Sequence, residues 1–418
     1  MKKIEKRSIL AGLYGNALEW FDFLLYASFA PLFAILFFPT DVKYVSLMAT
    51  FGVFAIGFLM RPIGGIIIGH YADFHGRRQA LILSVTIMTL ATGSIAFLPS
   101  YQQIGLISPL LFTILRLIQG IAVGGELPGS ATFIIEHMFA DRRGFAGSLV
   151  LSTAFFGIFM GSLVASSISH LLSYEDLLQF GWRVAYVLGS LLGVIGIYLR
   201  IKSAEPSQYL NIKPSNELPA KQVFTQHKQS LLLAVIFTSI MALSNYVLIA
   251  YLPTFLVNAN YLPLRDAHTI NLIALLLLTL LIPIMGLLSD LIGRKPVFLG
   301  GLCFLLIGIF PVFWLLQQGS WWPALLGEVI LSLVLAPLNG TVPTILAEMF
   351  PTTVRASGTS IGYNLGQALF GGTVPLIALT LVEITGNHYA PAWYVFLWAI
   401  FVILSMRFLQ ESYKTILA

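Results

Sequence analysis

Residues 69–78 read GHYADFHGRR and close a long apolar run with two glycines, one aspartate and two arginines. The stretch GLLSDLIGRK, at residues 286–295, repeats this arrangement farther along the chain. The matching positions keep one constant offset and are Gly69 with Gly286, Asp73 with Asp290, Gly76 with Gly293, Arg77 with Arg294 and Arg78 with Lys295. A weaker similarity pairs EHMFADRRGFAGS, from Glu136, with EMFPTTVRASGTS, from Glu348. The sequence therefore predicts two halves built on one repeated plan, a pattern typical of transporters.

The composition around this repeat is that of a membrane protein. Of the 418 residues, 57% are hydrophobic and 10% are charged, whereas soluble proteins are about 25% charged. The basic N-terminus leads into an apolar run that is too long for a cleaved signal, so we expect a retained first helix. The single cysteine excludes an internal disulfide framework and a cysteine-rich metal site. The modest net charge of +5 needs no nucleic-acid partner.

Apolar segments long enough to cross a membrane recur along the whole chain. Twelve are predicted, at residues 8–37, 45–70, 79–98, 104–137, 145–171, 182–201, 229–257, 267–290, 296–316, 321–349, 354–383 and 390–407. The polar stretch KSAEPSQYLNIKPSNELPAKQVFTQHK separates the sixth from the seventh. The predicted fold is an all-α polytopic membrane protein with an N-terminal six-helix half at 1–201, a cytoplasmic linker at 202–228 and a C-terminal six-helix half at 229–418.

The distribution of Lys and Arg predicts the orientation of these helices. If the chain starts inside, almost all of its basic residues fall in the segments on the side of the termini. The opposite segments hold only Lys43, Arg183 and Arg265, and the membrane itself holds Arg61 and Arg116. Cytoplasmic segments are enriched in Lys and Arg, so both termini are predicted to be cytoplasmic.

Several motifs resemble those of a transporter family. GHYADFHGRR and its copy resemble the loop signature of the major facilitator superfamily, and RLIQG at residues 116–120 resembles its fourth-helix motif. EWFDF, FLMRPIGG, GGE, GWR and GYNLGQALFGGTVP resemble its metabolite:proton symporter family, relatives of proline/betaine, citrate, shikimate and 2-oxoglutarate importers.

The resemblance implies a multi-pass carrier of the bacterial cytoplasmic (inner) membrane that works by alternating access. The first, fourth, seventh and tenth helices would line a central cavity. The resemblance also implies that two charge pairs, Asp73 with Arg77 and Asp290 with Arg294, are cytoplasmic gating latches that hold the halves together when the carrier opens outward.

Two polar stripes cross the predicted first and fourth spans. Residues three and four apart share a helix face, and the stripes are Asn16, Glu19, Asp22 and Tyr26 in the first span, and Arg116, Gln119, Val123, Glu126 and Ser130 in the fourth. At 1.5 Å per residue Glu19 lies roughly 16 Å from the helix start, and Arg116 lies about as deep from the opposite face.

Charges at this depth are costly and usually functional. Burial favours a neutral carboxyl group and a nearby arginine favours an ionised one, so moving the arginine changes proton affinity. We therefore expect Glu19, Asp22 and Arg116 to couple transport to protons. The alternative is a permanent ion pair that fixes helix packing.

The candidate substrate contacts are spread over both halves. They are Tyr26, Arg61, Gln119, Glu126, Asn245, Tyr246, Asn364 and Gln367. Glu126 and Arg61 are expected either to pair with each other or to act on substrate. The polar groups of the second half are expected either to bind substrate or to join helices by hydrogen bonds.

The class of substrate stays open between two chemistries. Arginines can clamp a carboxylate, and aromatic rings can hold a quaternary ammonium group. A zwitterion such as proline or betaine would use both, whereas an organic carboxylate such as citrate or 2-oxoglutarate would use the arginines.

The leading hypothesis is a proton-coupled importer of a small polar metabolite. It needs no cofactor, because the proton gradient drives it, and its partners are the substrate, protons and the lipid bilayer, with no obligate protein partner. An exporter or passive facilitator of the same fold and a non-transporting membrane sensor are the alternatives. GTSIG at 358–362 matches G-x-S-x-G but lacks the strand-turn-helix context of a hydrolase. Walker A, HExxH and Cys/His metal motifs do not occur in the sequence, so we do not expect an enzyme.

Overall fold

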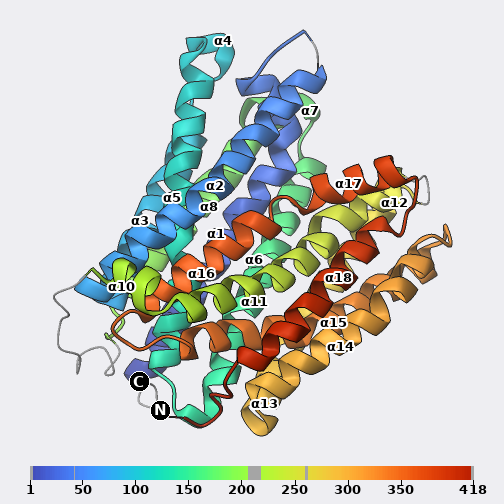
Figure 1. Cartoon of the computed structure of the whole chain (residues 1–418). Helices are drawn as coiled ribbons and strands as arrows, with labels where there is room; N and C mark the ends of the chain where they lie inside the picture. The colour runs from blue at the N-terminus through green and yellow to red at the C-terminus, as the bar shows by residue number, and fades with distance from the viewer. Residues whose placement is uncertain (1–2, 42, 206–217, 259–261, 416–418) are drawn as a thin grey trace. The chain divides into compact units, whose positions relative to one another are not determined.

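The chain folds into helices in the computed structural model, which describes residues 3–41, 43–205, 218–258 and 262–415. Over these ranges there is no strand, and twelve helical segments are long and apolar enough to cross a membrane. In lipid every backbone N–H and C=O needs an internal partner, and a helix supplies these partners within one segment. Figure 1 shows these helices in chain order.

The first compact unit comprises Met1–His137 and Thr153–Ala220. Its helices are α1 (Lys3–Phe37), α2 (Lys43–His75), α3 (Arg77–Ala96), α4 (Tyr101–Ile104), α5 (Ile107–Glu136), most of α6 (Arg143–Leu171), α7 (Tyr174–Asp176), η2 (Leu177–Gly181) and α8 (Trp182–Ile201). Residues 206–217, which form much of the predicted linker, lie outside the described residues.

The second compact unit comprises Met138–Ser152 and Lys221–Ala418. Its helices are η1 (Ala140–Arg142), the start of α6, most of α10 (Pro219–Gln226), α11 (Lys228–Tyr246), η3 (Val247–Tyr251), α12 (Leu252–Asn258), α13 (Leu264–Ile292), α14 (Arg294–Leu316), α15 (Trp321–Glu348), α16 (Arg355–Phe370), α17 (Val374–Thr385), α18 (Ala390–Ser405) and η4 (Met406–Phe408). The sequence did not predict that residues 138–152 pack with the second half of the chain.

One predicted span contains a π-helical turn, and another is interrupted. The segment predicted at 229–257 divides into α11, the π-helical turn η3 and α12. The segment predicted at 354–383 divides into α16 and α17. Gly371 and Gly372 lie at the break between α16 and α17, because glycines weaken a helix. A proline near the start of α17 suits the first turn of a new helix.

Glycines let α2 and α5 approach closely in the first unit. A Cβ atom on Gly64 of α2 would collide with the backbone carbonyl of Ile121, and one on Gly120 of α5 would collide with the carbonyl of Gly57. Gly124 meets the carbonyl of Arg61 in the same way. Small residues at such contacts allow the van der Waals packing that holds membrane helices together. This packing positions Arg61 and the polar stripe of α5 in the same unit.

Candidate functional site

Asp22, Gln119 and Arg116 form a buried polar cluster in the first unit. Gln119 Nε2 donates to Asp22 Oδ2 at 2.8 Å, and Gln119 Oε1 accepts from Arg116 Nη1 at 2.6 Å. Arg116 Nη1 lies 3.9 Å from Asp22 Oδ2. Thr92 of α3 accepts a second bond from Gln119 Nε2 at 2.9 Å. Acid and base are therefore linked mainly through an amide, which leaves the ion pair itself long.

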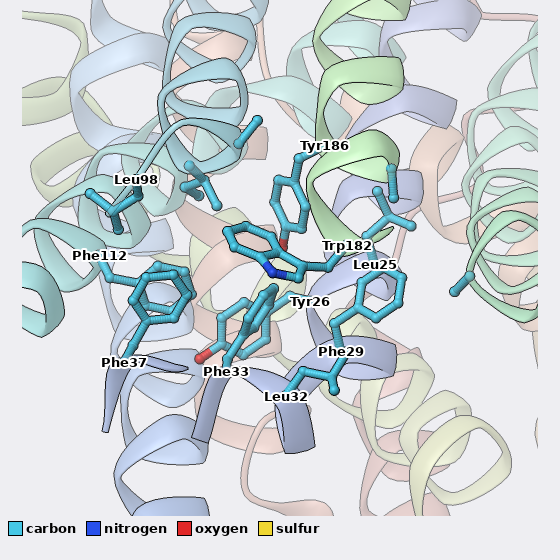
Figure 2. Close-up of a cluster of buried hydrophobic side chains, with 14 of the residues drawn as sticks. Leu25, Tyr26, Phe29, Leu32, Phe33, Phe37, Leu98, Phe112, Trp182 and Tyr186 are labelled. Atoms are coloured by element: carbon cyan, nitrogen blue, oxygen red, sulfur yellow. The ribbon is translucent and has the colours of Figure 1, made fainter. Parts of the chain in front are cut away.

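An aromatic cluster fixes the arginine of this site. The Arg116 guanidinium lies 4.0 Å from the centroid of the Tyr26 ring, and the Tyr26 hydroxyl donates to Thr50 O at 2.7 Å. Figure 2 shows Tyr26 beside Phe33 and Trp182 among the buried side chains that surround it. Tyr26 was predicted to contact substrate, but here it supports Arg116 and ties α1 to the backbone of α2.

Glu19 lies one helical turn before Asp22 and outside this cluster. Its side chain is buried, and its Oε2 atom has no hydrogen-bond partner among the described residues. It lines a cavity of about 10 Å³ together with Ser84, Met88, Val123 and Glu126. A single water molecule needs about this volume. Glu19 is therefore a buried acid beside a space that suits one water.

Glu126 pairs with Arg200, and the predicted pairing with Arg61 is wrong. Arg200 Nη1 donates to Glu126 Oε2 at 2.9 Å, and Arg200 Nη2 donates to Glu126 Oε1. Ser84 adds a bond to Oε2 at 3.0 Å. Arg200 stands at the end of α8 and was counted among the basic residues of the cytoplasmic side, but it is 1% exposed because its side chain folds back between helices.

Arg61 forms no ion pair within 4.0 Å among the described residues, although its charge acts on the nearby Glu19 carboxyl. Its guanidinium lies 4.1 Å from the ring centroid of Phe58 and 5.5 Å from those of Trp20 and Phe23. The side chain is buried, and among the described residues no hydrogen bond or ion pair satisfies it. A buried cation costs much less free energy when an anion or a polar acceptor pairs with it, so this position favours an anionic ligand.

Three of the polar candidates of the second unit form hydrogen bonds to other protein groups. The side-chain amides of Asn245 and Asn339 form two reciprocal hydrogen bonds, of 2.8 Å and 2.9 Å, which join α11 to α15. Asn364 donates to Ser360 O of its own helix at 2.8 Å, and Gln367 donates to the Tyr363 hydroxyl at 3.0 Å. These contacts support the interpretation of Asn245 and Asn364 as structural groups.

Tyr246 and Gln367 keep more scope for binding. Tyr246 is buried at the end of α11, where η3 begins. The Gln367 Oε1 atom is buried and accepts no hydrogen bond among the described residues. A buried unsatisfied carbonyl oxygen favours a ligand donor or a water, because leaving it unpaired costs about 1–3 kcal/mol.

The repeated stretch forms the same sharp turn between two helices in each unit, between α2 and α3 and between α13 and α14, here called the corner. Gly76 and Gly293 have φ angles of 106° and 107°, which a side chain rarely tolerates, and each directly precedes a helix. Asp73 pairs with Arg77 at 2.6 Å, and Asp290 pairs with Arg294 at 2.7 Å. The repeat therefore encodes a backbone turn and an ion pair one helical turn apart.

Further carboxylates complete each corner. Glu136 lies 3.3 Å from Arg77, and Glu348 lies 3.4 Å from Arg294. Glu205 accepts from the backbone N–H groups of Arg77 and Arg78, and Glu411 accepts from those of Arg294 and Lys295. These acids cap the first turns of α3 and α14, where the helix dipole favours negative charge.

The second corner also holds the start of α6. Asp290 Oδ1 accepts from Gly144 N at 2.8 Å, and Asp290 Oδ2 accepts from Phe145 N at 2.7 Å. Arg143 lies 3.9 Å from Glu348. Asp290 therefore ties α6 to α13 in addition to pairing with Arg294, which explains why residues 138–152 belong to the second unit.

Sequence reasoning missed several residues of these networks. Arg200, Thr92, Glu205 and Glu411 were not singled out as partners of the charged stripes. Glu136 and Glu348 opened the weaker repeat, and that repetition was the signal that could have placed them at the corners. The acids at 205 and 411 carry no such shared motif.

A family model matches most of the N-terminal half of the chain and the beginning of the C-terminal half. The model described as Major Facilitator Superfamily matches residues 15–278. The chain belongs to the Major Facilitator Superfamily. A second model, described as "Sugar (and other) transporter", matches residues 214–417. The predicted recognition and the predicted twelve-helix fold are confirmed.

Two bacterial relatives align over nearly the whole chain. Alpha-ketoglutarate permease of Escherichia coli (strain K12) is 36% identical over 97% of this chain and 94% of its own length. A glycine betaine/proline/ectoine/pipecolic acid transporter of Dickeya dadantii (strain 3937) is 31% identical over 97% of this chain and 83% of its own. Both are similar in sequence to this member of the superfamily, as the motifs predicted.

The fold also matches a solved structure. The proton:xylose symporter XylE, bound to 6-bromo-6-deoxy-D-glucose, superposes with a TM-score of 0.86 over 99% of this chain and 98% of that one. The sequences are 18% identical. This member of the superfamily is a multi-pass inner-membrane transporter and not an enzyme, so GTSIG at 358–362 is a helix sequence in α16.

Proposed function

We propose that this transporter imports a small polar metabolite that carries a carboxylate, together with protons. The Asp22, Gln119 and Arg116 cluster carries the proposal. A neighbouring cation favours the ionised form of a carboxyl group, and burial favours the neutral form. If Arg116 shifts away from Asp22 during the transport cycle, Asp22 takes up a proton, and the return of Arg116 releases it.

Gln119 makes this exchange adjustable. Its amide accepts from Arg116 and donates to Asp22, so a rotation of this one side chain weakens both contacts. Glu19 supplies a second acid one turn away, beside the cavity that suits one water. We expect Asp22 to be the leading coupling residue and Glu19 to relay the proton.

Arg61 supports the choice of a carboxylate substrate. It is a buried guanidinium framed by Trp20, Phe23 and Phe58, without an ion-pair partner among the described residues. A guanidinium binds a carboxylate through two parallel N–H bonds, and apolar walls strengthen these bonds by excluding water.

The relatives point to the same chemical group. Alpha-ketoglutarate, glycine betaine, proline, ectoine and pipecolic acid, the solutes in the names of the two bacterial relatives, all carry a carboxylate. They differ in their remaining charge. We therefore propose the carboxylate as the shared recognition element, with both termini cytoplasmic, the proton gradient as the energy source and no cofactor.

Transport by purified protein in proteoliposomes tests the proposal. Under an inward proton gradient we expect accumulation of radiolabelled 2-oxoglutarate or glycine betaine, and we expect Asp22→Asn to abolish accumulation while counterflow persists. Asp41→Asn, which changes an exposed acid, serves as the matched control. Equal net accumulation by Asp22→Asn and wild type would contradict a coupling role and favour a passive facilitator.

Substrate recognition is tested separately at Arg61. We expect Arg61→Gln to raise KM for the accepted solute by about tenfold or more, because a charge-assisted bond contributes roughly 1.5–3 kcal/mol. Arg183→Gln, at the opposite end of the first unit from the corner, is the control arginine. An unchanged KM in Arg61→Gln would exclude Arg61 as the carboxylate anchor.

A further inference from the structure

The second unit contains a buried acid that the proposed coupling cluster does not use. Glu328 lies on α15, about 10 Å from the start of the helix at 1.5 Å per residue. Its side chain is fully buried. Asn271 of α13 donates to its Oε2 atom at 3.0 Å, and its Oε1 atom has no hydrogen-bond partner among the described residues.

Asn271 also donates to a backbone carbonyl in the π-helical turn η3, between α11 and α12. In η3 the N–H of Leu252 donates to Val247 O, five residues back. The same pattern would require the N–H of residue 253 for Leu248 O, but Pro253 has none. Asn271 Nδ2 fills this vacancy by donating to Leu248 O at 2.6 Å.

One amide group therefore serves two acceptors. The two hydrogens on Nδ2 of Asn271 are divided between the Glu328 carboxyl and the Leu248 carbonyl. A bond to an ionised acceptor is shorter and roughly twice as strong as a bond to a neutral one. Ionisation of Glu328 would therefore draw the amide toward α15 and weaken its hold on Leu248.

Among the described side chains, no Lys, Arg or His forms an ion pair with Glu328, and the hydrogen-bond partner of its carboxyl is Asn271. Other titratable groups on the elements that pack against α15 include Asp266 and His268 at the start of α13 and Tyr251 of η3, and none of these bonds to Glu328. Basic residues of the neighbouring helices, Lys228, Arg294 and Arg355, are the first residues of α11, α14 and α16. They lie far along these helices from the end of α15 that carries Glu328. An isolated ionised carboxylate in such a site is costly, so this arrangement favours the protonated form of Glu328.

We propose that Glu328 is a second proton-binding site, and that its proton exchange is linked through Asn271 to the conformation of the π-helical turn η3 at residues 247–251. In the state described here the neutral acid and the Leu248 carbonyl share the amide. When the π-helical turn rearranges and water reaches α15, Glu328 releases its proton and draws the Asn271 amide to itself. π-helical turns inside longer helices frequently mark functional sites.

This site extends the proposed proton coupling, but its titration does not depend on it. Infrared difference spectroscopy of purified protein in lipid vesicles, recorded as a pH titration without substrate, follows carboxylic C=O bands directly. We expect a band that disappears as the pH rises, that is absent in Glu328→Gln, and that persists in Asp22→Asn and Glu19→Gln. Glu328→Asp keeps the acid but shortens the side chain, so it should move the band rather than remove it.

Hydrogen exchange of residues 247–258 supplies the second readout. We expect exchange in the wild type to quicken at the pH where the band disappears, and exchange in Glu328→Gln to stay slow because the amide mimics the protonated acid. A Glu328 band that persists across all pH values at which the protein stays folded would overturn the proposal and leave a permanently neutral tether. Titration of the band without any change in hydrogen exchange would overturn the link to the π-helical turn.

Discussion

Arg200 of α8 donates from Nη1 and Nη2 to the two carboxylate oxygens of Glu126 of α5. The same guanidinium donates to Leu81 O of α3 at 2.7 Å and to Ala11 O of α1 at 3.4 Å. One buried side chain thus joins four helices of the first unit. We therefore expect this pair to determine the stability of that unit.

Arg200→Ala should lower the free energy of unfolding by about 3–5 kcal/mol, because it leaves Glu126 buried without its cation. Thermal unfolding in detergent, followed by tryptophan fluorescence, measures the change. Lys202→Ala alters an exposed cation two residues away and should stay within about 0.5 kcal/mol of the wild type. Replacing both partners, as in Arg200→Met with Glu126→Leu, should cost less than Arg200→Ala. Equal stabilities of Arg200→Ala and Lys202→Ala would show that the pair holds nothing together.

Gly64→Ala should destabilise the protein by about 1–3 kcal/mol, since overpacking forces backbone shifts. The added methyl group would collide with the carbonyl of Ile121 on the neighbouring helix. Gly52 lies in the same helix, and a Cβ atom there would meet nothing within 4 Å. Gly52→Ala should therefore be neutral or slightly stabilising in the same unfolding assay. If Gly64→Ala were as neutral as Gly52→Ala, α2 and α5 could separate at no cost in stability.

Asn245→Ala should reduce stability by about 0.6–1.7 kcal/mol, the usual range for a hydrogen bond between membrane helices. It should leave the KM for transport unchanged, because the Asn245 amide is already bound to Asn339. Uptake kinetics and unfolding of the same preparations separate the two roles. In the double variant Asn245→Ala with Asn339→Ala the two costs should not add, since the residues share both bonds. A raised KM with normal stability would return Asn245 to the substrate site.

Glu205→Gln should change how stability depends on pH. Burial raises the pKa of the Glu205 carboxyl, and this effect outweighs the backbone donors of Arg77 and Arg78. A pKa that is higher in the folded than in the unfolded state contributes stability that is complete at acidic pH and is lost as the pH rises through the folded value. The advantage of the wild type over the Gln variant should therefore shrink from acidic to neutral pH. Unfolding temperatures across a pH series measure it, and an advantage that grows with pH would show that the helix dipole dominates instead.

Helical periodicity explains what the sequence could predict about the site. Asp22 and Arg116 were placed on inward stripes because residues three and four apart share a face, and the structure brings them into one cluster with Gln119. The repeated positions 73 with 77 and 290 with 294 likewise form ion pairs in both units. These predictions required only the spacing along one helix or one repeat.

The partners of Glu126 and the interrupted helices required tertiary information. Counting Lys and Arg assigned Arg200 to the cytoplasmic side because it ends a span, but its long side chain reaches back to Glu126. Hydropathy could not show the π-helical turn near Leu248 or the break near Gly371, because apolar composition continues through both. The Asn271 contact with Glu328 depends on which helices are neighbours, and no periodicity within one helix reports that.

Glu205 and Glu411 each follow the last long helix of a half and return to cap that half's third helix. The order of synthesis gives this arrangement a consequence for biogenesis. The cap on α3 becomes available as soon as residue 205 has emerged from the ribosome, while most of the C-terminal half has still to be translated. Each half therefore carries its own closing signal, and membrane insertion of the first can reach a defined corner while the second is still being made.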